Sequence, residues 1–393
     1  MTLTFESNLW KVYLFKFFIS LHFIGGVIVP FFTDWGGISF TQVMILQSWF
    51  MLWIFLFEIP TGTVADYFGR KHSLALAAIV NSIAAIVYAS TPNFYIFLLG
   101  EVLWALSEAL ISGASEAFVY DTLIIIDEEE RSKKVFGRVE SFGLSGMMIA
   151  APVGSVIAAQ FGLRAPMLLL FIPFTIAFII ALTFKEPEMR REVERKSYFS
   201  ILRKGVKFFY EDKILKILAL DMVFIFSISH FMIWLYQPML KQAGVGIAYF
   251  GIVGAGFVAS EILIMNNYER LEYILGSKKR LIFFSSVITG IMFVLGGLTT
   301  SIPVVLMAIF LGGGFGLSRK PLFISYMNKY IPSGERATVI STISMLISFA
   351  LVIANPIIGL SVDWSLNYTL IILGSAAIVF SFISKVEEDH LID

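Results

Sequence analysis

The strongest constraint on this chain is a series of long apolar runs separated by short polar stretches. Each run has about 18 or more residues, enough for one helix to cross a hydrocarbon core of roughly 30 Å. A segment in lipid must satisfy its own backbone hydrogen bonds, so it folds as a helix. We read twelve runs, at residues 10–32, 39–64, 73–90, 94–121, 137–160, 165–184, 214–238, 246–267, 281–299, 303–329, 337–361 and 366–384. The sequence therefore predicts an all-α membrane protein with twelve transmembrane helices.

The composition excludes several classes of soluble protein. Hydrophobic residues make up 58% of the chain and charged residues 15%, whereas soluble domains carry roughly 25% charged residues. The formal net charge is +0, so no overall field attracts nucleic acid. The chain has 0 cysteines, which removes disulfide scaffolds and thiolate sites. No nucleophile–base arrangement, metal-ligand spacing or nucleotide-binding motif occurs, so we expect no enzyme, cofactor, metal site or nucleic-acid partner.

One long polar stretch, residues 185–213, divides the chain into two halves, residues 1–184 and 214–393. Six runs fall in each half, which predicts two pseudo-symmetric six-helix halves. Most of the 29 Lys and Arg residues fall on the side of the N-terminus when the helices are threaded through a bilayer. We therefore expect a cytoplasmic linker at 185–213 and cytoplasmic N- and C-termini. The amphipathic piece of this linker, residues 198–210, either lies on the inner membrane surface or is a solvated part of the linker.

Ionisable residues inside the bilayer follow a period of three helices. Placing an ionisable side chain in the bilayer costs free energy, so such a residue is a candidate for a functional site by default. The first, fourth, seventh and tenth helices carry them, whereas the third, sixth, ninth and twelfth carry none in their cores. We expect the charged helices to surround a water-accessible cavity between the halves. The candidates for proton coupling or for the substrate cavity are His22, Glu101, Glu108, Glu116, Asp221, His230, Arg319 and Lys320.

The fourth helix is the most informative, because Glu101 and Glu108 are seven residues apart and share one face. A carboxyl that loses water at this depth can bind and release a proton, and Glu108 or Asp221 is our candidate for the coupling proton. The alternatives are a structural acid paired with Arg319 or Lys320, and an acid at a water-filled mouth.

The two basic residues of the tenth helix are adjacent, so they point in different directions. One of Arg319 and Lys320 could pair with Glu108 or Glu116 or bind an anionic substrate group, while the other snorkels to the inner surface. A structural ion pair is the alternative. The two histidines, His22 and His230, either bind a proton or act as hydrogen-bonded packing residues.

Two stripes of small residues could allow close helix packing. The fifth helix has Gly146, Ala150 and Gly154, and the eighth helix has Gly251, Ala255 and Ala259 at the same spacing. Small residues four positions apart let helix backbones approach each other in lipid. The stripes predict a contact between these two helices, or else packing of each stripe within its own half.

A ten-residue motif, Gly62-Thr-Val-Ala-Asp66-Tyr-Phe-Gly69-Arg70-Lys71, stands between the second and third helices. It matches the pattern G-x-x-x-D-x-x-G-R-[RK] and resembles the signature loop of the major facilitator superfamily. Its glycines permit a tight turn and close backbone approach, and its aspartate suits a helix N-terminus. The arginine needs an acidic partner, for which we expect Asp121. The resemblance implies that this cluster closes the cytoplasmic side as a gate.

The resemblance also implies a secondary transporter of the cell membrane that works by alternating access, binds a small-molecule substrate and functions as a monomer. The stretch Glu58-Ile-Pro60-Thr-Gly62 resembles the drug/proton antiporter branch, which implies proton-coupled export of amphiphilic organic compounds. The fifth helix departs from that branch, because Ala151 stands before Pro152 where the branch has glycine. The alternatives are a solute:proton symporter or organic-anion carrier, and a non-transporting membrane sensor or scaffold.

Overall fold

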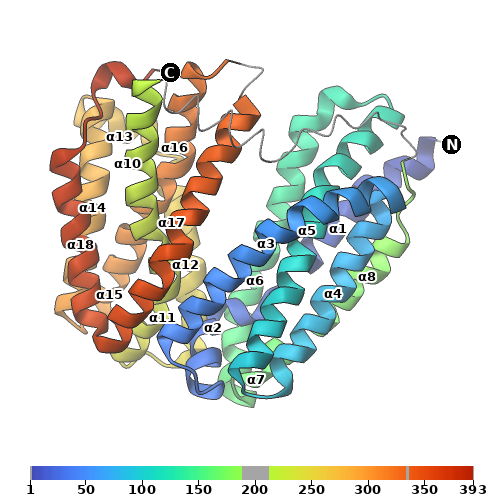
Figure 1. The fold of residues 1–393 in the computed structure, drawn as a ribbon, viewed down its shortest axis with the longest axis horizontal. Helices are drawn as coiled ribbons and strands as arrows, with labels where there is room; N and C mark the ends of the chain where they lie inside the picture. Colours follow the sequence, from blue (N-terminus) through green and yellow to red (C-terminus); the bar gives the residue numbers. More distant parts are fainter. Residues whose placement is uncertain (1, 188–211, 333–335, 393) are drawn as a thin grey trace. The chain divides into compact units, whose positions relative to one another are not determined.

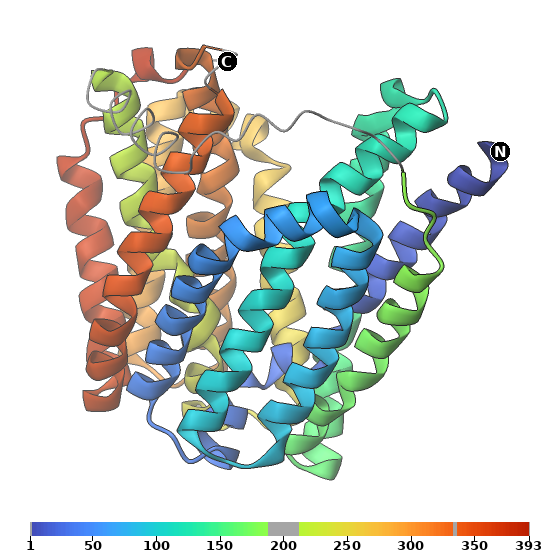
Figure 2. The same cartoon turned by 45° about the vertical axis from the view of Figure 1, so that its right-hand side comes forward.

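The computed structural model describes residues 2–187, 212–332 and 336–392, without the side chains of residues 2–4, 59–60, 62–68 and 337–338. The chain divides into two compact units. Unit 1 contains residues 1–193 and 247–252, and unit 2 contains residues 194–246 and 253–393. Figures 1 and 2 show each unit as a bundle of helices. Most of the linker expected at 185–213, including its amphipathic piece at 198–210, lies outside the described residues.

Both units consist of long apolar helices joined by short connections. Unit 1 contains α1 (Thr2–Ile19), η1 (Phe23–Gly26), α2 (Ile28–Pro30), η2 (Phe31–Trp35), α3 (Phe40–Phe68), α4 (Arg70–Ser90), α5 (Phe94–Ile125), η3 (Glu129–Arg131), α6 (Ser132–Phe161), α7 (Arg164–Leu169) and α8 (Phe171–Leu182). The following helices are α10 (Lys213–His230), α11 (Met232–Gln242), η4 (Ile247–Tyr249), α12 (Phe250–Met265), α13 (Tyr268–Leu275), α14 (Lys278–Leu298), α15 (Ile302–Met307), η5 (Ala308–Gly313), α16 (Gly314–Tyr330), α17 (Arg336–Trp364), α18 (Leu366–Ile383) and η6 (Glu388–His390).

Eleven spans among the described residues are long and apolar enough to cross a membrane, and one bent helix pair makes twelve. The predicted all-α membrane fold with twelve spans is therefore confirmed. Polar residues begin several helices at defined points, since Ser39, Asn93, Asp212, Ser277 and Ser365 each accept a hydrogen bond from a backbone amide of the first turn.

The first span is broken, whereas the apolar run predicts one continuous helix over residues 10–32. Its two parts, Phe5–Gly26 and Ile28–Trp35, meet at an angle of 66°. Gly25 and Gly26 lie in the short η1 segment at the break, where glycine costs little because the backbone is not in a regular α-helix. Every residue around the break except His22 is apolar or small, so hydropathy alone does not reveal it.

The stripe of small residues in α6 packs against the first span of the same unit. A Cβ atom at Gly146 would meet the backbone of Phe17, and one at Gly154 would meet the backbone of Phe23. At the start of α12, a Cβ atom at Gly251 would meet the backbone of Ala151. These glycines therefore allow backbone-to-backbone contact, which is the role that the spacing of small residues predicts.

The motif between α3 and α4 is mostly helical, whereas the sequence predicts a loop. Helix α3 continues to Phe68 and α4 begins at Arg70, so only Gly69 separates them. Gly69 has φ 92° and ψ 153°, a conformation that side-chain-bearing residues rarely adopt. One glycine therefore makes the whole turn, and the motif's polar residues extend the two helices beyond their apolar runs.

Candidate functional site

The motif's arginine forms the ion pair that the sequence predicts. The guanidinium of Arg70 contacts the carboxylate of Asp121 at the end of α5, and its Nη1 also donates to the carbonyl of Ala117 at 2.7 Å. The carboxyl of Asp121 is buried, with 1% of its side chain exposed. A buried charge needs such a partner, so the pair ties the start of α4 to α5. The side chains of Gly62 and Asp66 lie outside the described residues, and the gate role of the motif stays a prediction.

An acid that the sequence analysis did not select completes this cluster. Glu186, just after α8, accepts hydrogen bonds from the backbone amides of Arg70 at 2.8 Å and Lys71 at 2.7 Å. A carboxylate at this place satisfies two amides that the first turn of α4 leaves without helical partners. Glu388 in unit 2 accepts in the same way from the amides of Lys278 at 3.0 Å and Lys279 at 2.8 Å.

The change Glu186→Ala should lower the free energy of unfolding by about 1 kcal/mol, because a helix start loses its capping group. Urea unfolding of the purified protein in detergent measures this. Glu130→Ala is a suitable control, because Glu130 is exposed and lies in the short η3 segment of the same unit. Equal stability of the two variants would contradict the capping role.

The three acids of α5 lie in three different environments. Glu101 is buried, with 5% of its surface exposed, whereas Glu108 is half-buried and Glu116 is exposed. Glu108 lies close enough to Lys16 of α1 for the two side chains to interact electrostatically. Lys16 in turn forms an ion pair with Glu140 of α6 at 3.5 Å. The predicted file of three acids is therefore divided between a closed site around Glu101 and a more open site around Glu108.

The aromatic surroundings of the two histidines indicate packing roles. His22 lies at the break of the first span, where its Nε2 is 3.0 Å from the carbonyl of Ile19. Its ring centroid is 5.4 Å from that of Trp104 and 5.8 Å from that of Phe174. In unit 2, the ring of His230 lies 6.2 Å from that of Phe226. Both arrangements match the hydrogen-bonded or packed alternative, and their roles in proton binding stay predictions.

The charged residues of unit 2 form a buried ion pair. Arg319 of α16 has 0% of its surface exposed and contacts Asp221 of α10, which has 3% exposed. The Arg319 guanidinium also donates to the carbonyl of Ile282 at 2.6 Å and to Ser285. Ser384, after α18, donates to the other Asp221 oxygen at 2.5 Å. The structure thus favours the structural-pair alternative for Arg319, with Asp221 as its acid in place of Glu108 or Glu116.

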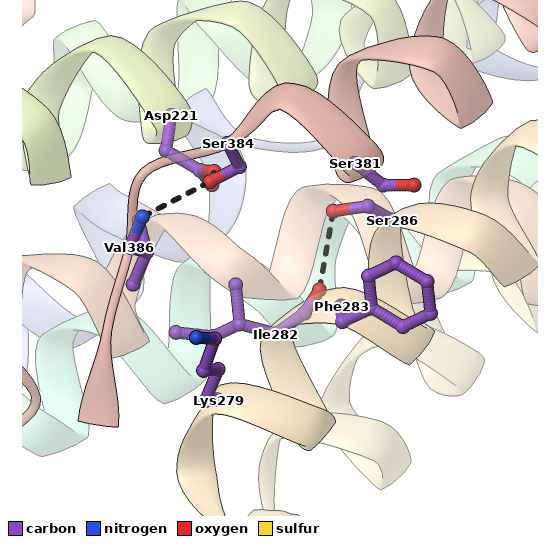
Figure 3. Close-up of a pocket in the computed structure, with 8 residues that line it drawn as sticks. All are labelled: Asp221, Lys279, Ile282, Phe283, Ser286, Ser381, Ser384 and Val386. Atoms are coloured by element: carbon purple, nitrogen blue, oxygen red, sulfur yellow. Dashed lines mark hydrogen bonds between the residues drawn. The ribbon is translucent and has the colours of Figure 1, made fainter.

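A cavity of about 40 Å³ is lined in part by Asp221 (Figure 3). Its lining includes the side chains of Ser286, Ser381 and Ser384 and the exposed residue Lys279. This volume and these polar groups suit one or two water molecules. Asp221 therefore both pairs with Arg319 and borders a small polar space.

Two further groups next to Arg319 have distinct surroundings. Tyr268 of α13 shares a 2.5 Å hydrogen bond with Ser318, and burial raises the pKa of Tyr268 to about 12. The phenol therefore stays neutral at physiological pH and ties α13 to α16. Lys320 is half-buried, and its Nζ lies 5.2 Å from the ring centroid of Phe226. It forms no ion pair with any described residue.

Sequence reasoning missed several polar residues that the structure places beside the candidates: Gln47, Tyr88, Glu140, Glu186 and Ser384. It also missed Asn81 of α4, which is buried and has no hydrogen-bond partner among the described residues. The signal that could have found most of them is a polar residue within a predicted span, counted whether or not it is charged. Within the described ranges, no group of three or more His, Cys, Asp and Glu residues could hold a metal ion.

Residues 13–270, well over half of the chain, match the family described as Major Facilitator Superfamily. The chain belongs to the major facilitator superfamily. It is therefore a multi-pass membrane transporter of small molecules and not an enzyme. The family that the motif resembles is thus confirmed.

Two bacterial proteins are similar to this chain in sequence. An uncharacterized MFS-type transporter of Bacillus subtilis (strain 168), YxaM, is 20% identical over 367 residues, which is 90% of each chain. Multidrug resistance protein 2 of the same organism is 27% identical over 180 residues, 45% of this chain and 43% of that protein.

Two solved structures show the same fold over nearly the whole chain. The nucleoside transporter NupG has a TM-score of 0.77 at 13% identity, covering 96% of this chain and 99% of that chain. A bacterial homolog of the human lysosomal transporter Spinster, inward-facing and occupied, has a TM-score of 0.74 at 16% identity, covering 99% and 98%. At these identities the likeness concerns the fold alone.

Proposed function

We propose that this transporter exports amphiphilic organic compounds from the cell in exchange for protons, with both termini in the cytoplasm. Similarity to Multidrug resistance protein 2 over 180 residues supports the substrate class. The observation that carries proton coupling is the environment of Glu108. This carboxyl is half-buried in a membrane span and lies beside Lys16. Lys16 also forms an ion pair with Glu140.

The site around Glu108 suits reversible proton exchange for two reasons. Partial exposure gives protons access to the carboxyl, and Lys16 offsets the negative charge once the proton has left. Asp221, the other acid considered for this role, is less suitable because its protonation would leave Arg319 buried without a counter-charge. We therefore place the coupling proton on Glu108.

The change Glu108→Gln should abolish transport driven by a pH gradient, because the amide cannot release a proton. Exchange of substrate across proteoliposomes without a gradient should persist, because the site keeps its shape. Both are measured with the purified protein and a panel of cationic, neutral and anionic compounds. Glu116→Gln is the matched control, an exposed acid on the same helix that should keep coupled transport.

Coupled transport that survives in Glu108→Gln would remove this residue from the mechanism. If the wild-type protein moves no compound of the panel in either assay, the alternative of a non-transporting sensor or scaffold gains support.

A second candidate function is carriage of organic anions, by symport with a proton or by exchange. The half-buried Lys320 favours it, since its charge is not balanced by any described acid and it lies over the Phe226 ring. An anionic aromatic compound could use both groups. Transport of anions alone in the same panel, lost in Lys320→Met, would decide for this function.

A further inference from the structure

The tenth span carries a positive charge that the buried ion pair of unit 2 does not use. Arg319 and Lys320 are adjacent on α16, so their side chains leave the helix in directions about 100° apart. Arg319 pairs with Asp221 and donates hydrogen bonds to α14. Lys320 instead lies near α10, where its Nζ is 5.2 Å from the ring centroid of Phe226. The helix therefore places one charge in a closed pair and the other in half-buried surroundings.

Three half-buried side chains, Phe226, His230 and Lys320, meet where α10 packs against α16 (Figure 1), and we call them the Lys320 cluster. Phe226 and His230 are four residues apart on α10, so they share one face of that helix. Their ring centroids lie 6.2 Å apart. Lys320 lies over the Phe226 ring and close enough to His230 for the two basic side chains to interact electrostatically. Each of the three side chains is therefore joined to the other two.

The positive charge of Lys320 has no acid to balance it among the described residues. The acids of α10, of α16 and of the helices in contact with them are Asp221 of α10, Glu261 of α12, Glu269 and Glu272 of α13, and Asp363 of α17. None of them forms an ion pair with Lys320. An unpaired charge inside a span is costly. The Lys320 cluster therefore has the electrostatic character of an anion site.

His230 can add a hydrogen bond to the same anion. An imidazole has at least one N–H to donate, and His230 forms no hydrogen bond with a described residue. Ring contacts with Phe226 and Phe231, each with centroids 6.2 Å apart, hold its place beside Lys320. A carboxylate has two oxygens, so one can accept from the ammonium and the other from the imidazole.

We propose that the Lys320 cluster is a binding subsite for an aromatic monocarboxylate. Lys320 pairs with the carboxylate, His230 donates to its second oxygen, and Phe226 packs against the aromatic part of the ligand. The cation–π contact between Lys320 and Phe226 is weaker than an ion pair, so the ammonium turns to a carboxylate that enters. One full positive charge suits a monoanion better than a doubly charged phosphate. This inference rests on the second candidate function and supplies its ligand class and its residues.

The test measures binding at equilibrium, with the purified full-length protein in detergent and isothermal titration calorimetry. The probes are naphthoate, its neutral amide naphthamide, cyclohexanecarboxylate and inorganic phosphate, each also titrated into empty micelles. Naphthoate should bind saturably and at least about tenfold more tightly than naphthamide or phosphate, because it alone of these three offers both a single charge and a ring. Naphthoate that binds no better than naphthamide, or phosphate that binds as tightly as naphthoate, would overturn the proposal.

Variants of α10 and α16 assign the subsite. Lys320→Met should weaken naphthoate binding at least about tenfold, whereas Lys320→Arg should keep most of it because it keeps the charge. His230→Leu should weaken binding about tenfold, the effect of one lost hydrogen bond to a charged group. Lys329→Met is the matched control, because Lys329 is an exposed lysine on the same helix as Lys320. Unchanged binding in Lys320→Met, or an equal loss in Lys329→Met, would show that naphthoate does not use the Lys320 cluster.

Phe226→Leu separates recognition of the ring from recognition of the charge. It should weaken naphthoate binding about three- to tenfold and leave cyclohexanecarboxylate binding unchanged, because only an aromatic ligand loses an aromatic partner. Phe224→Leu is the control, since Phe224 is exposed on the same helix and its ring stacks on that of Phe380 at 4.1 Å. An equal loss of both carboxylates in Phe226→Leu would overturn the aromatic part of the proposal.

Binding requires no transport, so the subsite and the carrier function can fail separately. Naphthoate binding that Lys320→Met removes, in a protein that does not move naphthoate across proteoliposomes, supports the subsite and contradicts the carrier function. Naphthoate transport that is undiminished in Lys320→Met supports the carrier function and overturns the subsite.

Discussion

Replacing Arg319 with Met should destabilise unit 2 more than any other single charge change, by about 3–5 kcal/mol. The change leaves Asp221 buried, and among the described residues the hydroxyl of Ser384 is its one remaining partner. It also removes the donors to Ser285 and Ile282 of α14, so α10, α14 and α16 lose a shared contact. Denaturant unfolding in detergent, with the fraction of monodisperse protein as a second readout, measures the loss.

Two further variants separate the ion pair from simple packing. The double change Asp221→Asn with Arg319→Met removes both charges and should recover most of the lost stability, because no buried charge is left alone. Lys320→Met alters the adjacent residue, which forms no ion pair with the described part of the chain, and should cost less than about 1 kcal/mol. A stable Arg319→Met variant, or a double variant no better than the single one, would show that the pair does not hold unit 2 together.

Replacing Gly154 with Ala should destabilise the protein by about 1–3 kcal/mol, although it adds only one methyl group. The added Cβ would overlap the backbone of Phe23, which cannot move aside as a flexible side chain can. Helix α6 and the η1 segment would have to separate, and His22 at the break would move with them. The same unfolding measurement applies, and Trp104 fluorescence reports the displacement of His22, whose ring lies 5.4 Å away.

The matched control is Gly137→Ala on the same helix. Nothing lies within 4 Å of a Cβ atom at Gly137, so this change should be neutral or stabilise α6 by up to about 1 kcal/mol through helix propensity. The two variants should therefore differ by about 1–4 kcal/mol. Similar stabilities would show that α6 and η1 adjust to each other without cost, contrary to the close packing of their backbones.

Sequence reasoning located the helices well because hydropathy depends only on local composition. The ends were less accurate, since α6 begins at Ser132 rather than residue 137 and α3 continues to Phe68 through most of the polar motif. Charged first and last turns lie outside the apolar run and carry no hydropathy signal. The break after Gly26 was missed for a related reason, because glycine and apolar residues have the same hydropathy in a continuous helix and in a broken one.

The candidate site was predicted in its residues but only partly in its pairings. The contact of Arg70 with Asp121 was expected because a known motif places the arginine beside the end of α5. The pairing of Arg319 with Asp221 was an open alternative, and that of Lys16 with Glu140 was not considered. Periodicity places two residues on one face of one helix. It does not say which other helix that face meets.

The sequence alone determined that this chain crosses a membrane twelve times, carries charged residues inside several spans and bears a motif that resembles the signature loop of its family, because apolar length, charge and spacing are local properties. Only the tertiary structure decided that Asp221 neutralises Arg319, that Glu101 and Asn81 are buried, and that the first span is broken. These features depend on how helices rotate and tilt against one another, and that geometry follows from packing between segments far apart in the chain.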